Sequence, residues 1–278
     1  MRATGKVQSN VERHGRRPAV VGLGRLGYAA KAVLYFVIGL LALRLAMGNG
    51  GANTDTKGAV HYLAGLPFGT VLLVVLCVGL LGLVAWRAVQ LFVESPKQKT
   101  PAKRWMHRGG VIASAVAHTA LLAATVRLLT SGRSGGSSNA TRDWTARLMD
   151  APFGQALVAV AGVIVLGFGA REVWKAYKRS FEKKLMLDGV AAKQSHRLTR
   201  ICQFGVAARG AVFAIMGLFL LQAAIRHDPS EARGIGQTLS TIAEGPFGMI
   251  LLGLVAAGLI AYAVYALVEA RYRRMPAT

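Results

Sequence analysis

The sequence predicts an all-α, polytopic membrane protein, a bundle of six transmembrane helices built from three two-helix repeats that a pseudo-threefold axis relates. Three observations predict this fold. Six long apolar stretches are separated by polar segments, the tripeptide Pro-Phe-Gly recurs at matching places, and Lys and Arg gather in alternate loops.

The composition favours a membrane over water as the surroundings of the chain. Hydrophobic residues make up 53% of the 278 residues and charged residues only 17%, whereas a soluble domain carries about a quarter charged residues. Too little polar surface remains to cover a water-exposed globule. The chain also lacks the alternating segments of about ten residues that are typical of membrane β-barrels, so the spans are expected to be helices.

Six stretches are long enough to cross a bilayer. A helix needs about 20 mostly apolar residues to cross a hydrocarbon core of roughly 30 Å. The apolar run after the polar, basic residues 1–17 is too long for the core of a cleavable signal peptide, so it is predicted to be an uncleaved first span. The predicted spans are residues 26–47, 68–92, 110–129, 153–174, 203–225 and 247–268.

The distribution of basic residues predicts the orientation. Residues 1–31, 87–108, 171–209 and 271–278 carry 26 of the 34 Lys and Arg residues, and the acidic residues divide evenly between the two sides. By the positive-inside rule these segments are cytoplasmic, and so are both termini. The formal charge of +22 is therefore mainly a topology signal that also attracts anionic inner-leaflet lipid. We expect the lipid bilayer, and no nucleic acid, as the partner of this charge.

The tripeptide Pro-Phe-Gly marks an internal repeat of roughly 90 residues, because each copy opens an even-numbered span. Pro suits the first turn of a helix, where its missing N–H has no partner to lose, and Phe suits the membrane interface. A ligand contact through the outer loops is the alternative role. The copies are Pro67-Phe68-Gly69, Pro152-Phe153-Gly154 and Pro246-Phe247-Gly248.

Each repeat therefore consists of a span, an outer loop with a short amphipathic piece, Pro-Phe-Gly and a second span. Since each unit contains two spans, all three units insert in the same orientation. The predicted divisions are a basic cytoplasmic tail at 1–21, repeat unit 1 at 22–95, a basic linker at 96–108, repeat unit 2 at 109–178, a basic cytoplasmic linker at 179–202, repeat unit 3 at 203–270 and a basic tail at 271–278.

The odd spans repeat a stripe of glycine, base and aromatic at intervals of four residues, which places the three side chains on one helical face. The first and third units carry Gly27, Lys31 and Tyr35, and Gly205, Arg209 and Phe213. The middle unit has Gly110 but replaces the base and the ring. The candidate contacts for an anionic lipid headgroup or solute are Lys31, Ser114, Arg209, Tyr35, His118 and Phe213.

Two roles are open for the bases of this stripe. Lys31 and Arg209 could snorkel to the inner interface, or pair with Glu172 or Glu269 near the inner ends of even spans. Alternatively they could line a basic inner vestibule that holds an anionic headgroup or solute. For His118, a hydrogen bond to a neighbouring helix stands against a ligand or proton-relay role.

The remaining motifs predict no enzyme and no cofactor. Residues 22–27 match G-x-G-x-x-G, but no strand precedes them, so the βαβ context of a dinucleotide site is absent. Cys77 and Cys202 show no spacing typical of a disulfide framework or a zinc site. Ser, His, Asp and Glu form no recognisable catalytic set, so we expect neither catalytic nor metal-binding residues.

The residues of the repeat resemble a known bacterial membrane family, domain of unknown function 1206 (DUF1206). The resemblance rests on Gly27-Tyr28-Ala29-Ala30-Lys31, on its counterpart beginning at Gly205, and on the threefold Pro-Phe-Gly. It covers about residues 22–270 and implies six spans in three pairs, with no assigned activity. The middle unit departs most from the pattern, at Ser114 and His118.

The sequence therefore favours a non-enzymatic, multi-pass protein of the bacterial inner membrane that organises lipid or an unidentified membrane-protein partner. A transporter or channel for a small solute, anionic in particular, along the pseudo-threefold axis is the alternative. An intramembrane enzyme is the third class. The apolar middle of every span favours the scaffold.

Overall fold

The computed structural model describes residues 18–48, 55–92, 101–132, 140–182 and 192–272, and this part of the chain is helical without strands. Most of both predicted basic tails, residues 96–100 of the first inner linker and residues 183–191 of the second lie outside these residues. The long helices are α2 (Pro18–Ala46), α4 (Gly69–Phe92), α5 (Pro101–Ser131), α7 (Gly154–Tyr177), α8 (Ala192–Arg226) and α10 (Gly248–Tyr272). The short helices are α3 (Thr56–Ala64), α6 (Ala140–Met149), η2 (Pro229–Glu231) and α9 (Ile235–Glu244).

The six long helices are long and apolar enough to cross a membrane, which confirms the predicted multi-pass architecture. Twenty-four residues of helix, the length of α4 and of α7, extend roughly 36 Å. The candidate spans are Gly24–Ala46, Gly69–Ala88, Arg108–Ser131, Gly154–Tyr177, Ser195–Arg226 and Gly248–Tyr272.

The three repeat units share an element order of a long helix, a short α-helix, a tight turn and a second long helix, and unit 3 adds the 3-10 helix η2 before its short α-helix. The short helices are the amphipathic pieces that the sequence predicts. In α3, Asp55 accepts a hydrogen bond from the backbone N–H of Gly58 at 2.6 Å and so caps the helix. The buried face of α3 is apolar, with Val60 and Leu63 packed toward the long helices.

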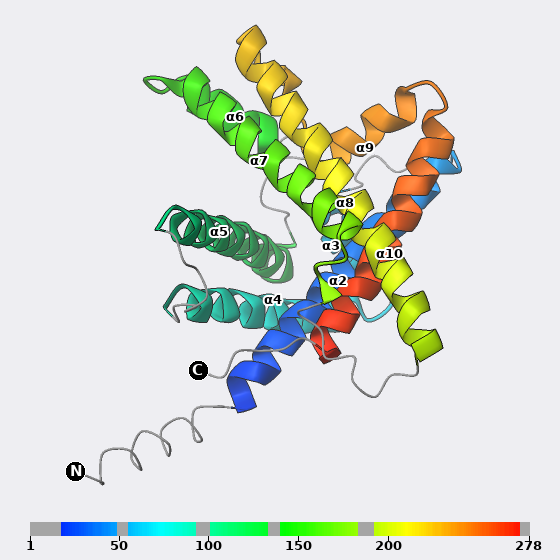
Figure 1. Cartoon of the computed structure of the whole chain (residues 1–278). Coiled ribbons are helices and arrows are strands. Elements are labelled where there is room, and N and C mark those ends of the chain that lie inside the picture. Colours follow the sequence, from blue (N-terminus) through cyan, green and yellow to red (C-terminus); the bar gives the residue numbers. More distant parts are fainter. Residues whose placement is uncertain (1–17, 49–54, 93–100, 133–139, 183–191, 273–278) are drawn as a thin grey trace, which may run out of the picture.

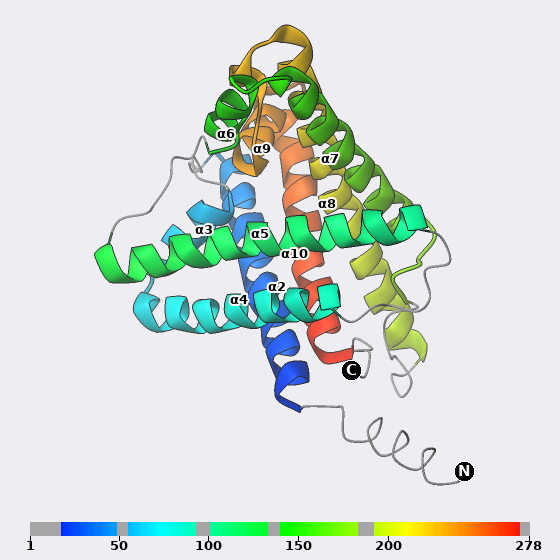
Figure 2. The same cartoon turned by 90° about the vertical axis from the view of Figure 1, so that its left-hand side faces the viewer.

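The long helices pack as three pairs, each of which joins two units: α4 with α5, α7 with α8, and α10 with α2. The pairs run in three different directions (Figures 1 and 2). Within the units, α2 packs on α4 and α8 packs on α10. The order α2, α4, α5, α7, α8, α10 and back to α2 is therefore that of a ring with threefold pseudosymmetry. One joint differs, because no comparable packing joins α5 to α7 among the described residues.

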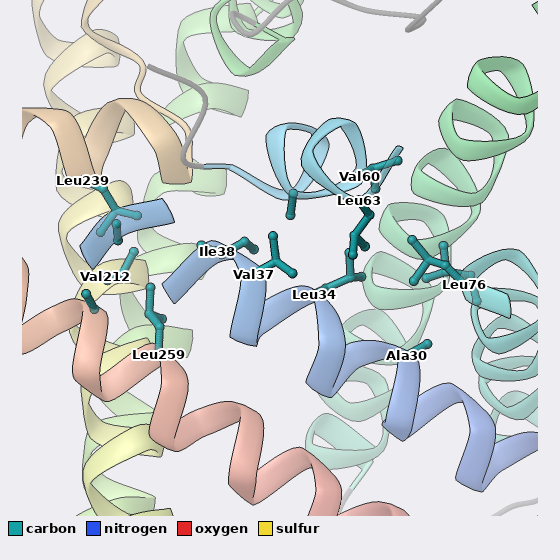
Figure 3. Close-up of a cluster of buried hydrophobic side chains, with 14 of the residues drawn as sticks. Ala30, Leu34, Val37, Ile38, Val60, Leu63, Leu76, Val212, Leu239 and Leu259 are labelled. Atoms are coloured by element: carbon teal, nitrogen blue, oxygen red, sulfur yellow. The ribbon is translucent and has the colours of Figure 1, made fainter. Parts of the chain in front are cut away.

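The main apolar core surrounds α2 (Figure 3). Leu34, Val37 and Ile38 of α2 are buried against α3 and α4 on one side and against α8, α9 and α10 on the other. Ile38 is fully buried, and Leu259 of α10 lies in the same cluster. Helix α2 consequently joins the rest of unit 1 to unit 3.

The Pro-Phe-Gly tripeptide forms a turn before the helix rather than the first turn of the helix, which corrects the position expected for Pro67, Pro152 and Pro246. Helices α4, α7 and α10 begin at the glycine of each copy. In the first copy, the N–H of Gly69 donates to the carbonyl of Leu66 at 2.8 Å. Pro at the first central position and a positive φ at the second are the features of a type II turn.

The aromatic residue of each turn has a left-handed backbone, which is unusual for a bulky side chain. The φ angles are +62° at Phe68, +60° at Phe153 and +56° at Phe247, and the three rings are 82%, 85% and 84% exposed. The glycine that follows is required sterically, because a Cβ at Gly154 would lie 2.0 Å from the carbonyl oxygen of Leu148. The same close approach occurs at Gly69 and Gly248.

Candidate functional site

Charged and aromatic side chains from four long helices meet beside the apolar core, and we call them the basic-aromatic cluster. The helices are α2, α7, α8 and α10, so residues from all three repeat units take part. The cluster consists of Lys31 and Tyr35 of α2, Phe168 and Glu172 of α7, Arg209 and Phe213 of α8, and Tyr262 of α10.

Arg209 lies at the centre of this cluster. Its Nε donates a hydrogen bond to the Tyr35 hydroxyl at 2.8 Å, and its Nη1 lies 3.3 Å from Oε2 of Glu172. The side chain is only 12% exposed. Aromatic rings surround the guanidinium and attract it through their π faces. The distances from its Cζ to the ring centroids are 4.7 Å for Phe213, 4.9 Å for Tyr262, 5.2 Å for Phe168 and 5.6 Å for Tyr35.

Lys31 reaches the same cluster from α2. Its Nζ lies 5.0 Å from the centroid of the Tyr262 ring, so Tyr262 is shared between Lys31 and Arg209. Tyr35 packs edge-on against Tyr262 with the ring centroids 4.6 Å apart. No ion pair of Lys31 occurs within the described part of the chain, so the aromatic ring is its close partner there. The two predicted bases therefore face the seam between units 1 and 3.

Two buried carboxylates accompany the bases. Glu172 pairs with Arg209 and also with Lys175, whose Nζ lies 3.3 Å from its Oε1. Glu269 of α10 is buried as well, and it lies close enough to Lys31 to attract it electrostatically. The ion pair between Arg209 and Glu172 is one of the two alternative roles that the sequence analysis gave for the bases.

Arg87 of α4 adds a further positive charge that the sequence did not single out. It is close enough to Lys31 to repel it, as is Arg209. Its Nη1 donates to Oε1 of Gln90 at 2.8 Å, while its Nε is buried and has no hydrogen-bond partner among the described residues. The region thus holds four cations, including Lys175, against two carboxylates, and the surplus is positive.

The middle unit contributes differently. Nδ1 of His118 contacts the backbone carbonyl of Ser114 at 2.5 Å and lies 3.4 Å from the Oγ of Ser114, so this pair interacts within α5. His118 is still within electrostatic reach of Lys31, Arg87 and Arg209. The structure therefore brings together Lys31, Tyr35, Arg209 and Phe213 of the predicted set, and it leaves Ser114 and His118 beside the cluster.

The even helices supply the cluster residues that sequence reasoning missed. Phe168 and Tyr262 each stand fourteen residues after the glycine of Pro-Phe-Gly in their own units, where the first unit has Leu83. The repeat register of the even spans was thus the signal that could have found them. Arg87 and Glu172 follow the same rule, since both stand eighteen residues after that glycine.

The comparisons with known proteins agree with the threefold architecture. The sequence profile of the family described as "Domain of Unknown Function (DUF1206)" matches three segments of the chain, residues 26–92, 109–179 and 204–273. The chain belongs to the DUF1206 family. Each matched segment covers most of the first long helix of one unit and all of the second, so one DUF1206 repeat corresponds to one structural unit.

A similar protein is the "Uncharacterized protein YxxB" of Bacillus subtilis (strain 168), which is 29% identical over 259 residues, a match that covers 93% of each chain. No solved structure matches the chain. Within the described residues, no group of three or more His, Cys, Asp or Glu side chains is arranged to hold a metal ion. The basic-aromatic cluster therefore remains the candidate site.

Proposed function

We propose that this DUF1206 protein is a non-enzymatic protein of the bacterial cell membrane, with cytoplasmic termini, that binds anionic inner-leaflet lipid at the basic-aromatic cluster. The observation that carries the proposal is the surplus of positive charge in and around the cluster, where Lys31, Arg87, Lys175 and Arg209 accompany the two carboxylates Glu172 and Glu269. Lys31 has an aromatic ring but no ion pair among the described residues, and Arg87 keeps a buried Nε without a hydrogen-bond partner.

A surplus of positive charge within membrane-spanning helices favours an anionic ligand. Charged side chains inside a membrane are costly and usually pair with one another or face a functional site. Arg presents a planar set of donors that matches phosphate, and charge-assisted hydrogen bonds of this kind are roughly twice as strong as neutral ones. The hydroxyl of Tyr35, which accepts from Arg209, can donate its own hydrogen to the same ligand.

The packing around α2 supports lipid binding over conduction. Leu34 and Ile38, one and two turns beyond Lys31, are buried at 4% and 1% exposure, and Leu259 of α10 is buried beside them. Among the described residues, this layer of the bundle holds buried apolar side chains in place of the continuous polar lining that a solute pathway requires. This packing favours a scaffold that holds lipid at one depth.

The runner-up is a transporter for a small anionic solute. The observation that favours it is the threefold ring of helices, because the cluster draws residues from all three units around one centre. A flux assay in liposomes distinguishes the two functions. Uptake of inorganic phosphate that depends on Lys31 would support transport and contradict the scaffold.

The proposal is tested by measuring bound lipid and thermal stability together. We expect the wild type, purified in mild detergent, to retain phosphatidylglycerol, and the double variant Lys31→Gln with Arg209→Gln to lose it. The control is Arg226→Gln, since Arg226 is 61% exposed and pairs with Glu231 near the outer end of α8. A double variant that retains its lipid and its melting temperature would contradict the site. Lower stability with unchanged lipid retention would show that Lys31 and Arg209 only form ion pairs with Glu172 and Glu269, and would contradict the lipid site.

A further inference from the structure

Within unit 1, and likewise within unit 3, the two long helices meet at a contact between a glycine and an alanine. A Cβ at Gly79 of α4 would lie 2.5 Å from the Cβ of Ala30 on α2, and one at Gly258 of α10 would lie 2.2 Å from the Cβ of Ala208 on α8. Both glycines stand ten residues after the glycine of Pro-Phe-Gly. Small residues of this kind allow close approach of helix backbones in membranes.

In the middle unit the corresponding joint would lie between α5 and α7. Its alanine side is present on α5 but is exposed. Its counterpart of the alanines is Ala113 of α5, which is exposed. Gly110 has no heavy atom within 4 Å of a Cβ built upon it, whereas the corresponding Gly27 and Gly205 lie against the backbones of α4 and α10. The α5 surface that should meet α7 is present in the sequence, but no helix of the described part of the chain packs against it.

Ile164 explains why this joint is open. It stands at the position that Gly79 and Gly258 occupy in the other units, and its side chain is 65% exposed on α7. Since a single Cβ at either glycine would already collide with the facing alanine, an isoleucine prevents the same approach. The divergence of α5 from α7 is therefore encoded in the sequence of the middle unit.

The open joint borders the basic-aromatic cluster on both sides. Helix α7 contributes Phe168 and Glu172 to the cluster, and His118 of α5 is within electrostatic reach of its bases. Exposed apolar residues continue the two helix faces of the joint, because Val116 stands three residues after Ala113 on α5 and Val160 four residues before Ile164 on α7. They are 63% and 56% exposed. A ligand that fits this arrangement carries a negative charge at one end and hydrocarbon at the other.

We infer that the joint between α5 and α7 is the lateral entrance through which an anionic phospholipid reaches the cluster, and that one of its acyl chains lies between these helices. The inference rests on the proposed function and adds the route and the chain-binding surface. Charge complementarity selects an anionic lipid, because a neutral lipid would leave the surplus of Lys31, Arg87 and Arg209 uncompensated.

The test uses the full chain in nanodiscs of phosphatidylcholine that contain a minority of phosphatidylglycerol with a photoactivatable acyl chain. We expect crosslinks to concentrate on residues 112–124 of α5 and 157–168 of α7. The variant Ile164→Gly restores the glycine of the other units, so α5 should close on α7 and the crosslinks there should fall several-fold. The control is Val75→Gly, which removes a side chain of similar exposure, 61%, from α4.

The outcomes separate the entrance from the proposed function. Selective retention of phosphatidylglycerol with crosslinks elsewhere on the surface, or crosslinks unaltered by Ile164→Gly, would overturn the entrance and leave the lipid site standing. Equal retention of phosphatidylcholine and phosphatidylglycerol by the wild type would overturn both. If Ile164→Gly does not fold, Ala113→Phe fills the joint from the exposed position on α5, and the crosslinks there should again fall; unaltered crosslinks would overturn the entrance.

Discussion

Among individual residues, Arg209 shows how a charge can be kept inside a membrane helix. It combines an ion pair with Glu172, a hydrogen bond to Tyr35 and four aromatic rings around one guanidinium. Lys31 has the ring of Tyr262 instead. The two bases of the repeat are thus equivalent in position but unequal in pairing, so their removal should have different consequences.

Removal of the Tyr35 hydroxyl should destabilise the fold through Arg209. A hydrogen bond to a charged group contributes about 1.5–3 kcal/mol, and Tyr35→Phe leaves Nε of Arg209 without that partner. Unfolding by a denaturing detergent in mixed micelles measures the loss. Tyr177→Phe is the control, because Tyr177 is 74% exposed at the end of α7. Equal stability of the two variants would show that Arg209 finds another acceptor.

The left-handed Phe of the turn offers a second test at this scale. Phe68 has a φ of +62°, a conformation that costs an ordinary residue about 1–2 kcal/mol and glycine almost nothing. We expect Phe68→Gly to be as stable as the wild type in detergent, or more so, and Phe68→Val to be less stable, since branching at Cβ worsens the strain. Thermal unfolding of both variants checks this order, and the reverse order would contradict the turn geometry.

At the level of helices, glycines decide which faces meet. A Cβ added at Gly39 of α2 would lie 2.7 Å from Cγ1 of Ile260, and one added at Gly217 of α8 would lie 2.4 Å from the backbone nitrogen of Leu166. Both glycines were predicted from the sequence to allow close contact, one turn beyond the aromatic of the stripe. Gly39→Leu and Gly217→Leu should therefore lower the melting temperature, and an unchanged value for either would place that face against lipid.

Two glycines on α7 provide a matched comparison within one helix. A Cβ at Gly169 would lie 2.4 Å from the backbone nitrogen of Ala214, whereas one at Gly167 meets nothing within 4 Å. Gly169→Ala should separate α7 from α8 and destabilise the protein. Gly167→Ala should be neutral, or stabilising by about 0.5–1 kcal/mol through helix propensity. Loss of stability in Gly167→Ala would indicate that α5 or another segment covers this face.

The sequence predicted where the membrane-spanning helices lie, but it predicted only some of the contacts between them. Length and apolarity suffice to locate a span, and a base four residues from a glycine and from an aromatic marks one face. The conformation at Phe68 was not predictable, because bulky residues rarely adopt a positive φ. The open joint could have been suspected only from Ile164, which replaces the glycine of the other units. Its effect depends on the distance between backbones, and a single sequence does not contain that distance.

At the scale of the whole molecule, the last repeat unit packs against the first. The pairing of α10 with α2 brings the end of the third unit beside the beginning of the first (Figure 2). The cluster lies at this junction, since Lys31 and Tyr262 come from the two helices. Separate units could not assemble it. Because the two bases come from units 1 and 3, the replacement of the base and the ring by Ser114 and His118 in the middle unit does not remove them from the site.

The last prediction concerns the orientation of this ring in the membrane. The start of α2 and the end of α10 lie at the same end of the molecule (Figure 2). The sequence predicts that the segments with 26 of the 34 Lys and Arg residues share this side, so it should face the cytoplasm. Single cysteines introduced at positions 100, 190 and 275, after replacement of Cys77 and Cys202 by Ser, should be protected from a membrane-impermeant thiol reagent in intact cells. Cysteines at positions 53, 136 and 231 should be labelled. Labelling at position 190 would reverse the orientation and would place the basic-aromatic cluster toward the outer leaflet, where the attraction to anionic inner-leaflet lipid no longer applies.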